Sequence, residues 1–338
     1  MTIDLSKLNG AQRLLFEIPL IPVQGQRFQP TGFPGLGAAT FQTSNGACLL
    51  VESAQSMANR LELTCWDETR QDLKAELQGL SHVRVFRKGA FLTDTILESH
   101  RINSPYLLKS KLDQTFFNLI KGYFGNDEMG MIDRRFLARF LLQYDINSLL
   151  HGVFVSQSEL GGGRLRVPRA LSAFIEADDV KVAASGGVKN DQIHPSKVQG
   201  DKEGRFGNIP FARDEFTAEK ITLYVSLDLA QIRGYGLGAQ AENLLILISL
   251  FKLRSLVEGN LRLRTACDLR VAGNSITASN PAGFALPALD SLTAAIEPAI
   301  TVCREMMTVT EVTFNDELKK AKGGDEESSD EATTQEEA

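Results

Sequence analysis

Apolar and polar positions change their period from segment to segment, which predicts a mixture of strands and helices. Alternation or short apolar runs bounded by turn residues predict strands, whereas apolar residues three and four apart predict helices. The predicted strands are residues 13–21, 47–52, 149–156, 164–167, 221–229 and 260–267; the predicted helices are residues 54–65, 92–102, 112–122, 133–144, 239–257 and 285–307. The two kinds of element do not alternate strictly, so we expect an α+β fold.

Three segments lack such a period. Residues 24–37 are a loop rich in Gly and Pro, and residues 183–213 contain many turn formers. A loop as long as the second is usually functional or disordered. Residues 323–338 carry seven acidic residues and no basic one, which predicts a disordered tail. We therefore predict a single domain over residues 1–322, with a mostly helical insertion at about 67–147 and a long loop at about 183–213.

Composition excludes several classes of protein. The longest apolar run, Leu244 to Leu250, is far shorter than the roughly 18 residues of a membrane span, and the N-terminus does not resemble a signal peptide. Four cysteines without a CxxC pair indicate a reducing cytoplasm and neither a zinc site nor disulfides: Cys48, Cys65, Cys267 and Cys303. The formal charge of −6 comes from the tail, so nucleic-acid binding would require local basic stripes on a nearly neutral body.

The helix predicted at 54–65 begins with side chains suited to a phosphate. Ser53 is a good N-cap, and the apolar residues of the helix form one stripe. The polar residues away from that stripe are Gln55, Ser56, Asn59 and Arg60. Hydrogen-bond donors at a helix N-terminus favour an anion. A capped surface helix without a ligand is the alternative.

Two extended segments place arginines at alternate positions. Arg164 and Arg166 share one face of the first, with Arg169 shortly after, and Arg262 and Arg264 repeat the pattern. The planar guanidinium binds phosphate with two donors, so these strands are suited to follow a sugar–phosphate backbone. The alternative is an exposed sheet face that carries salt bridges.

A glycine-rich connection leads into the helix predicted at 239–257. Gly234, Gly236 and Gly238 would let backbone N–H groups approach a phosphate. The segment lacks the lysine of a nucleoside-triphosphate loop and the full spacing of a dinucleotide site. A tight turn between a strand and a helix is the alternative.

Catalytic groups are sparse. The four histidines, His82, His100, His151 and His194, share no metal-ligand spacing, and neither HExxH nor GxSxG occurs. We interpret His151, in a predicted apolar strand, as a core residue with satisfied hydrogen bonds. We expect no metal and no cofactor.

Together these residues resemble the Cas-seven family of the RAMP superfamily, the backbone subunits of type I CRISPR effector complexes. The closest likeness is to the type I-G (formerly I-U) branch, whose subunit is called Csb-one. The stretches that carry the resemblance are Gln24 to Gly37, Leu49 to Arg60, Leu97 to Tyr106, Leu149 to Asp191, Gly207 to Phe211 and Leu227 to Leu269. They span most of residues 13–270.

The resemblance implies an RRM-like (ferredoxin-like) palm with insertions called fingers and thumb. A Ser-x-Gln-Ser-like helix start that contacts RNA maps onto Ser53, Gln55 and Ser56, and Arg27 and Lys189 are further RNA-binding candidates in the matching stretches. The thumb would be residues 183–213, with Phe206, Ile209 and Phe211 as wedge residues between bases. We find no RNP-type aromatic motif, which favours backbone contacts over base stacking on the sheet.

The leading hypothesis is a non-catalytic cytoplasmic backbone subunit that holds guide RNA, with several copies stacked along the strand. Its expected partners are guide RNA, target DNA through the guide, other copies of itself and other CRISPR effector subunits, with no membrane. The alternative is a RAMP-type endoribonuclease that processes guide RNA or cuts target RNA, for which His100, His194 and Asp191 are the candidates. A nucleotide-binding enzyme that uses residues 234–238 fits least well.

Overall fold

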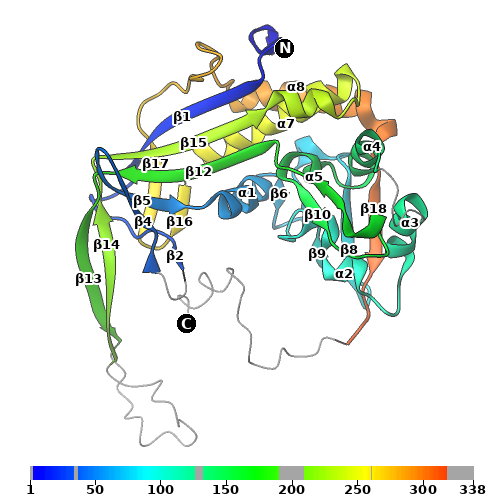
Figure 1. Cartoon of the computed structure of the whole chain (residues 1–338), viewed down its shortest axis with the longest axis horizontal. Coiled ribbons are helices and arrows are strands. Elements are labelled where there is room, and N and C mark those ends of the chain that lie inside the picture. Colours follow the sequence, from blue (N-terminus) through cyan, green and yellow to red (C-terminus); the bar gives the residue numbers. More distant parts are fainter. Residues whose placement is uncertain (1–2, 34–36, 126–131, 190–208, 260, 318–338) are drawn as a thin grey trace, which may run out of the picture.

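The structure is a computed structural model that describes residues 3–33, 37–125, 132–189, 209–259 and 261–317 (Figure 1). Its largest sheet has seven strands in the order β16-β17-β1-β15-β12-β5-β4. Neighbouring strands in this sheet are antiparallel. They are β1 (Arg13–Pro22), β4 (Thr40–Thr43), β5 (Gly46–Glu52), β12 (Leu171–Asp178), β15 (Lys220–Asp228), β16 (Leu261–Arg264) and β17 (Cys267–Val271).

The centre of this sheet has the ferredoxin-like topology. The chain runs through β1, helix α1 (Ala54–Leu63), β12, β15, helix α7 (Ala239–Glu258) and β17. The corresponding sheet order, β17-β1-β15-β12, places the first and third strands of this series at the centre. This is the β-α-β-β-α-β arrangement. The predicted α+β fold with an RRM-like palm is therefore confirmed.

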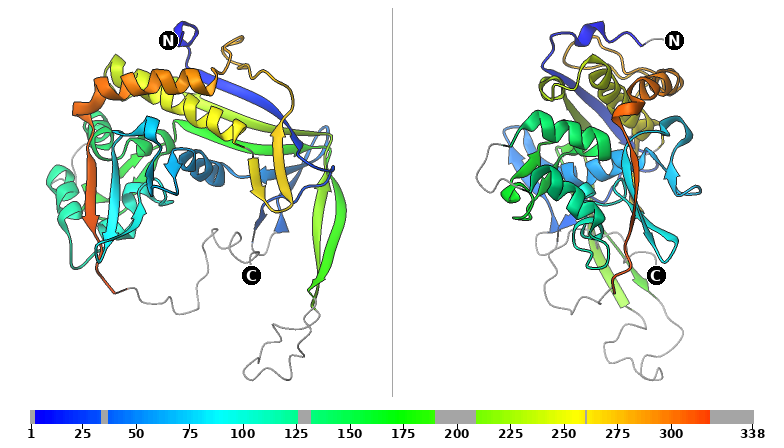
Figure 2. Two further views of the ribbon diagram at one scale, coloured as in Figure 1. Left: turned by 180° about the vertical axis from the view of Figure 1, so that it is seen from behind. Right: turned by 90° about the vertical axis from the view of Figure 1, so that its right-hand side faces the viewer.

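Hydrophobic alternation positions the palm strands. Leu14, Phe16, Ile18 and Leu20 of β1 are buried, while Glu17 and Pro19 between them are exposed. Helix α7 is buried on most of its circumference, because it packs against α8 (Leu289–Cys303) as well as the palm. Figure 2 shows both helices along one face of the sheet. A helix that is apolar all round requires such cover on two sides.

The insertion between α1 and β12 contains strands as well as the predicted helices. Strands β8 (His82–Arg87) and β9 (Ala90–Asp94) form a three-stranded sheet with β18 (Val309–Thr313), which is parallel to β8. The helices are α2 (Pro105–Leu108), α3 (Thr115–Phe124), α4 (Arg134–Tyr144) and α5 (Ile146–His151). The remaining short elements are β2 (Gly32–Phe33), β3 (Gly37–Ala38), β6 (Trp66–Asp67), β7 (Asp72–Leu73), β10 (Val153–Val155), β11 (Leu165–Val167) and α6 (Leu229–Gly234).

Two of the predicted elements in this region are wrong. The helix predicted at 92–102 is instead the end of β9, a turn and a 3-10 turn at Arg101–Asn103. The strand predicted at 149–156 is the end of α5 followed by β10. The change from helix to strand occurs at Gly152, whose φ is 79°. A Cβ on Gly152 would lie 2.9 Å from the carbonyl oxygen of Val167, so only glycine fits this turn.

The loop predicted at 183–213 is wrong at both of its ends, because residues 183–189 and 209–213 belong to strands. Strands β13 (Lys181–Lys189) and β14 (Ile209–Thr217) pair as an antiparallel hairpin that projects from the palm (Figure 1). The side chains of Val182 and Val188 are more than half exposed. Those of Glu215 and Phe216, near the palm, are buried. A ribbon that buries so little of either face needs no apolar alternation, so its sequence shows none.

A buried network of charges joins the insertion to the palm. Arg101 donates two hydrogen bonds to the Glu62 carboxylate, 2.7 Å from Nε to Oε1 and 2.6 Å from Nη2 to Oε2. Both side chains are almost inaccessible to solvent. Burial raises the pKa of Glu62, and the charge of Arg101 opposes that effect. This pair fixes α1 against the 3-10 turn of the insertion.

Beside this pair, Lys252 of α7 reaches the end of α5. Its Nζ lies 2.8 Å from Nε2 of His151 and contacts the side-chain oxygen of Asn147. Burial holds the pKa of His151 well below its usual value, and the neighbouring Lys252 lowers it further. His151 is therefore a core residue, as interpreted, although it ends a helix and does not lie in a strand. The expectation that all its hydrogen bonds are satisfied is wrong, because its buried Nδ1 has no partner among the described residues.

Replacing Arg101 with Met should lower the free energy of unfolding by about 3–5 kcal/mol, because Glu62 would remain as an uncompensated buried charge. Urea unfolding of the purified protein measures this loss. Arg70→Met, at an exposed position, is the matched control and should change little.

The double variant Glu62→Leu/Arg101→Met should recover most of that loss, because an apolar pair leaves no buried charge. A single Arg101→Met variant as stable as Arg70→Met would refute the structural role of the pair.

Candidate nucleic-acid interface

The start of α1 has the predicted cap. The Ser53 hydroxyl accepts a hydrogen bond of 3.2 Å from the backbone N–H of Ser56, so Ser53 is the N-cap. Met57, Ala58 and Leu61 are buried and hold the helix against the palm. Gln55 is exposed, and Ser56, Asn59 and Arg60 are partly exposed. The polar face therefore lies at the surface, as the sequence predicted.

Gln55 connects this helix to the arginine-rich segment at 164–169. Its side-chain oxygen accepts a hydrogen bond from Nη2 of Arg169, whose Nε donates to the carbonyl oxygen of His151 at 3.2 Å. Burial lowers the pKa of Arg169. Arg169 is thus held in place by α1 and by the end of α5, and it positions the start of β12 beside the N-terminus of α1.

The predicted alternation in the arginine-rich strand is confirmed. Leu165 and Val167 of β11 are buried, while Arg164 and Arg166 are exposed. Strand β11 pairs with β10 in a two-stranded ribbon, in which Arg166 lies opposite Phe154. The turn between the strands contains Gly163 at φ 69°, where a Cβ would lie 2.8 Å from the carbonyl oxygen of Ser156.

The glycine-rich connection lies next to this segment. Gln231 of α6 donates a hydrogen bond of 2.7 Å to the carbonyl oxygen of Pro168. Gly234, Gly236 and Gly238 are exposed, and the last two have positive φ. Tyr235 between them is buried, and its hydroxyl donates to the carbonyl oxygen of Leu149 at 2.7 Å. The connection is therefore fastened to the segment at 164–169 and to α5.

Glu52 at the end of β5 holds two of the predicted RNA-binding arginines. Nη2 of Arg264 forms an ion pair with the buried Glu52 carboxylate, and Nε of Arg60 lies 3.7 Å from it. Arg264 also donates to the carbonyl oxygen of Gln29 at 2.9 Å, and Arg60 to that of Leu263 at 2.7 Å. The structure thus gives both arginines internal partners that the sequence did not predict. Arg262, two residues before Arg264, is exposed.

Arg60 and Arg262 also line a shallow hollow of about 280 Å³ between α1, the end of α7 and β16. Lys74, which the sequence did not indicate, is the third basic residue there. Arg60 donates to the carbonyl oxygens of Arg262 and Leu263, and these hydrogen bonds connect β16 to α1 beside the hollow.

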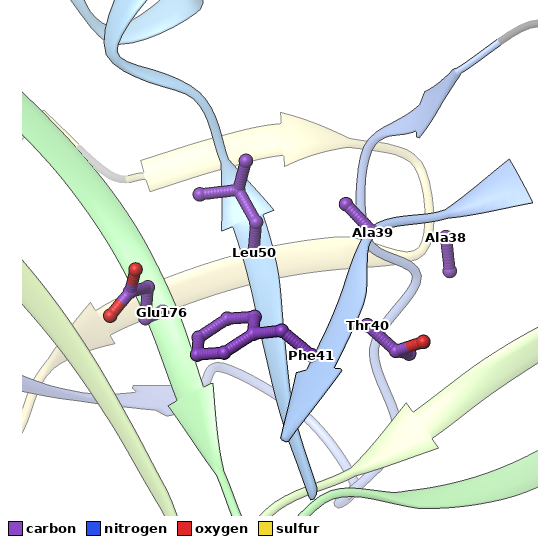
Figure 3. Close-up of a pocket in the computed structure, with 6 residues that line it drawn as sticks. All are labelled: Ala38, Ala39, Thr40, Phe41, Leu50 and Glu176. Carbon is purple, nitrogen blue, oxygen red and sulfur yellow. The ribbon is translucent and has the colours of Figure 1, made fainter. Parts of the chain in front are cut away.

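A second hollow lies at the other edge of the sheet and lacks basic residues. It is lined by Ala38, Ala39, Thr40, Phe41, Leu50 and Glu176 (Figure 3). Burial and the neighbouring Asp178 raise the pKa of Glu176, its only ionisable lining residue. A carboxyl group in place of cations makes this hollow a poor phosphate site.

Four further predicted residues, Arg27, Lys189, Ile209 and Phe211, lie on or near the projecting hairpin. Nε of Arg27 lies 3.6 Å from the Glu215 carboxylate at its base. Lys189 is paired with Ile209 at the far end of the described strands, and Phe211 lies in β14. Phe206 lies outside the described residues, as do Asp191 and His194.

Sequence reasoning missed two features near the interface. Phe154 of β10 is 55% exposed and faces outward beside Arg166. Arg134, Arg135 and Arg139 of α4 are exposed, and Arg135 packs beside Gly236. The spacing of these arginines on the polar face of an amphipathic helix was the available signal. The sequence contains no comparable signal for the exposure of Phe154, because its strand was predicted with the wrong boundaries.

The fold and the site define an α+β protein with an RRM-like palm, inserted elements and a polar, arginine-bearing surface. The family of CRISPR-associated protein GSU0053 matches residues 14–182, half of the chain. The protein therefore belongs to this CRISPR-associated family, and the predicted recognition is confirmed. No curated protein sequence matches the chain.

Among solved structures, the chain is similar to a chain of "CRISPR RNA-guided surveillance complex, pre-nicking". The two are 12% identical, the match covers 79% of this chain and 76% of that one, and the TM-score is 0.40. In the described part of the chain, no helix is long and apolar enough to cross a membrane. The same residues contain no cluster of three or more His, Cys, Asp or Glu side chains suited to a metal ion.

The structure predicts different effects for the two arginines of β16. Arg264→Ala should lower the free energy of unfolding by about 1–3 kcal/mol, because the buried Glu52 loses its closest partner. Arg262→Ala should stay within about 0.5 kcal/mol, because its side chain is exposed. Urea unfolding of both variants measures the difference, and equal losses would contradict the assignment of Arg264 to the fold.

Proposed function

We propose that this CRISPR-associated protein is a non-catalytic, guide-RNA-binding backbone subunit of a type I interference complex, of the Cas-seven, type I-G kind. The observation that carries the proposal is the contact between stretches far apart in the sequence. Gln55 touches Arg169, and Gln231, just before the glycine connection, touches Pro168. Arg60 extends the series to β16. Hydrogen bonds thus link four polar stretches in series, namely residues 231–238, 164–169, 53–60 and 262–264.

The chemistry of this surface suits a sugar–phosphate strand. Exposed Arg164, Arg166 and Arg262 supply positive charge, α1 supplies small polar side chains, and the glycines leave backbone accessible. A guide that itself pairs with target DNA does not require the protein to read bases by a fixed hydrogen-bond code. Binding should therefore be insensitive to sequence and decrease with salt.

The projecting hairpin supports the assembly part of the proposal. Strands β13 and β14 reach away from the palm as a ribbon with little buried surface (Figure 1). An isolated two-stranded ribbon is marginally stable in water and gains order from contacts with a partner. We assign it to the thumb, which would contact the RNA and a neighbouring copy in a stack of subunits. Other CRISPR effector subunits would bind at the ends of that stack.

Replacing Arg164, Arg166 and Arg262 together with Ala should remove the RNA that co-purifies with the protein. On single-stranded RNA the slope of log affinity against log salt should decrease by about 2, because each phosphate that is no longer neutralised removes roughly 0.7 from it. Absorbance of the purified protein and titrations at several salt concentrations measure these effects. Arg264 is left unchanged, because it stabilises the fold.

The matched control is Arg70→Ala/Arg270→Ala/Arg304→Ala, which removes three exposed arginines outside the four stretches. RNA retained by the first variant at the level of this control would exclude the interface.

A backbone subunit should leave RNA intact. Incubation of the purified protein with end-labelled repeat RNA should give no discrete products, because no positioned acid or base is proposed near the strand. Products that disappear in the His100→Ala variant would replace this proposal with an endoribonuclease.

A further inference from the structure

The outer face of the β10–β11 ribbon presents an aromatic ring next to a cation. Phe154 and Arg166 are directly opposite in the register, so their side chains leave the ribbon on the same side. Both are exposed, whereas Val155 and Leu165, on the inner side, are buried. The ring therefore stands on a strand whose other face is anchored in the core.

The turns at both ends of the ribbon restrict its position. Gly152 precedes β10 and Gly163 precedes β11, both at positive φ and too close to neighbouring backbone for a Cβ. Arg169 after β11 is held by α1 and α5. Phe154 thus occupies a fixed position beside the segment that the proposed function assigns to RNA, and little conformational freedom would be lost on binding.

Helix α4 adds positive charge beside the glycine connection, and a residue just before it lies beside the turn of the ribbon. Arg134, Arg135 and Arg139 are exposed and form no ion pair with any other residue that the structure describes. Arg135 lies beside Gly236, and Ile132, just before the helix, lies beside Gly161 of the ribbon turn. Like charges at positions four apart repel each other on a helix, so an anion bound here would relieve that repulsion.

We propose that Phe154 is a stacking platform for one base of the bound single strand, and that the arginines of α4 neutralise the phosphates that flank this base. The inference rests on the proposed function and adds a base contact to it. Stacking on an aromatic ring is tolerant of sequence, because every base has a π-face, and an adjacent Arg strengthens it. Arg166 supplies that cation.

The test is fluorescence anisotropy of the full chain with labelled single-stranded RNA and with a sugar–phosphate oligonucleotide of equal length that lacks bases. Phe154→Ala should weaken RNA binding by roughly 5- to 150-fold with the salt slope unchanged. Phe154→Trp should retain the affinity. On the base-free strand, the wild type and Phe154→Ala should bind equally.

The variant Arg134→Ala/Arg135→Ala/Arg139→Ala should behave in the opposite way and reduce the salt slope by about 2 on both strands. Leu112→Ala is the control for loss of an exposed apolar side chain, since Leu112 is 71% exposed. Urea unfolding shows whether Phe154→Ala and Leu112→Ala are equally folded, as two exposed positions should be.

If Phe154→Ala binds RNA as the wild type does, stacking is excluded while the proposed function remains, and the ring then serves a protein contact. An unchanged salt slope in the α4 variant would overturn the phosphate role of those arginines. A wild-type protein that binds neither strand would refute the proposed function itself.

Discussion

The pairing of Arg101 with Glu62 is the interaction on which the rest of the interface depends. It joins the insertion to α1 where water is excluded, and there a two-donor guanidinium–carboxylate pair is strongly directional. Arg101 also donates to the carbonyl oxygen of Gly152 at 3.3 Å. The adjacent carbonyl of His151 holds Arg169, which in turn holds Gln55. The surface polar contacts are therefore the outer end of a network that begins in the core.

This arrangement would give the nearly neutral body of the protein the strand-binding surface that we propose. The palm contributes α1, β16 and the glycine connection, and the insertion contributes α4, α5 and the ribbon that follows. Neither part contains the surface alone. Because buried hydrogen bonds set their relative position, the exposed arginines are placed before any ligand arrives, which reduces the ordering cost of binding.

The palm could be predicted from the sequence where one face of each element is buried. Alternation located β1 and β15, the Ser53 cap located α1, and the exposed Arg164 and Arg166 followed from their spacing. The projecting hairpin could not be predicted in this way, because it has no buried face and so no pattern.

The partners of the site residues were also beyond sequence reasoning. Glu52 binds Arg264 across the sheet, an ion pair between residues far apart in the chain that no spacing reveals. The exposure of Phe154 was missed for a related reason. Gly152, at positive φ, separates α5 from β10, but the apolar run around Gly152 predicts a single buried strand. Tertiary contacts decide both cases.

Strand β18 pairs in parallel with β8, with Val309 opposite His82, and this register has a consequence for synthesis of the chain. A ribosome delivers β8 and β9 long before β18, so the nascent insertion presents an unpaired strand edge until the C-terminal region emerges. Closing so long a loop is also slow. A polypeptide that terminated before residue 309 would keep that edge and tend to pair with other chains.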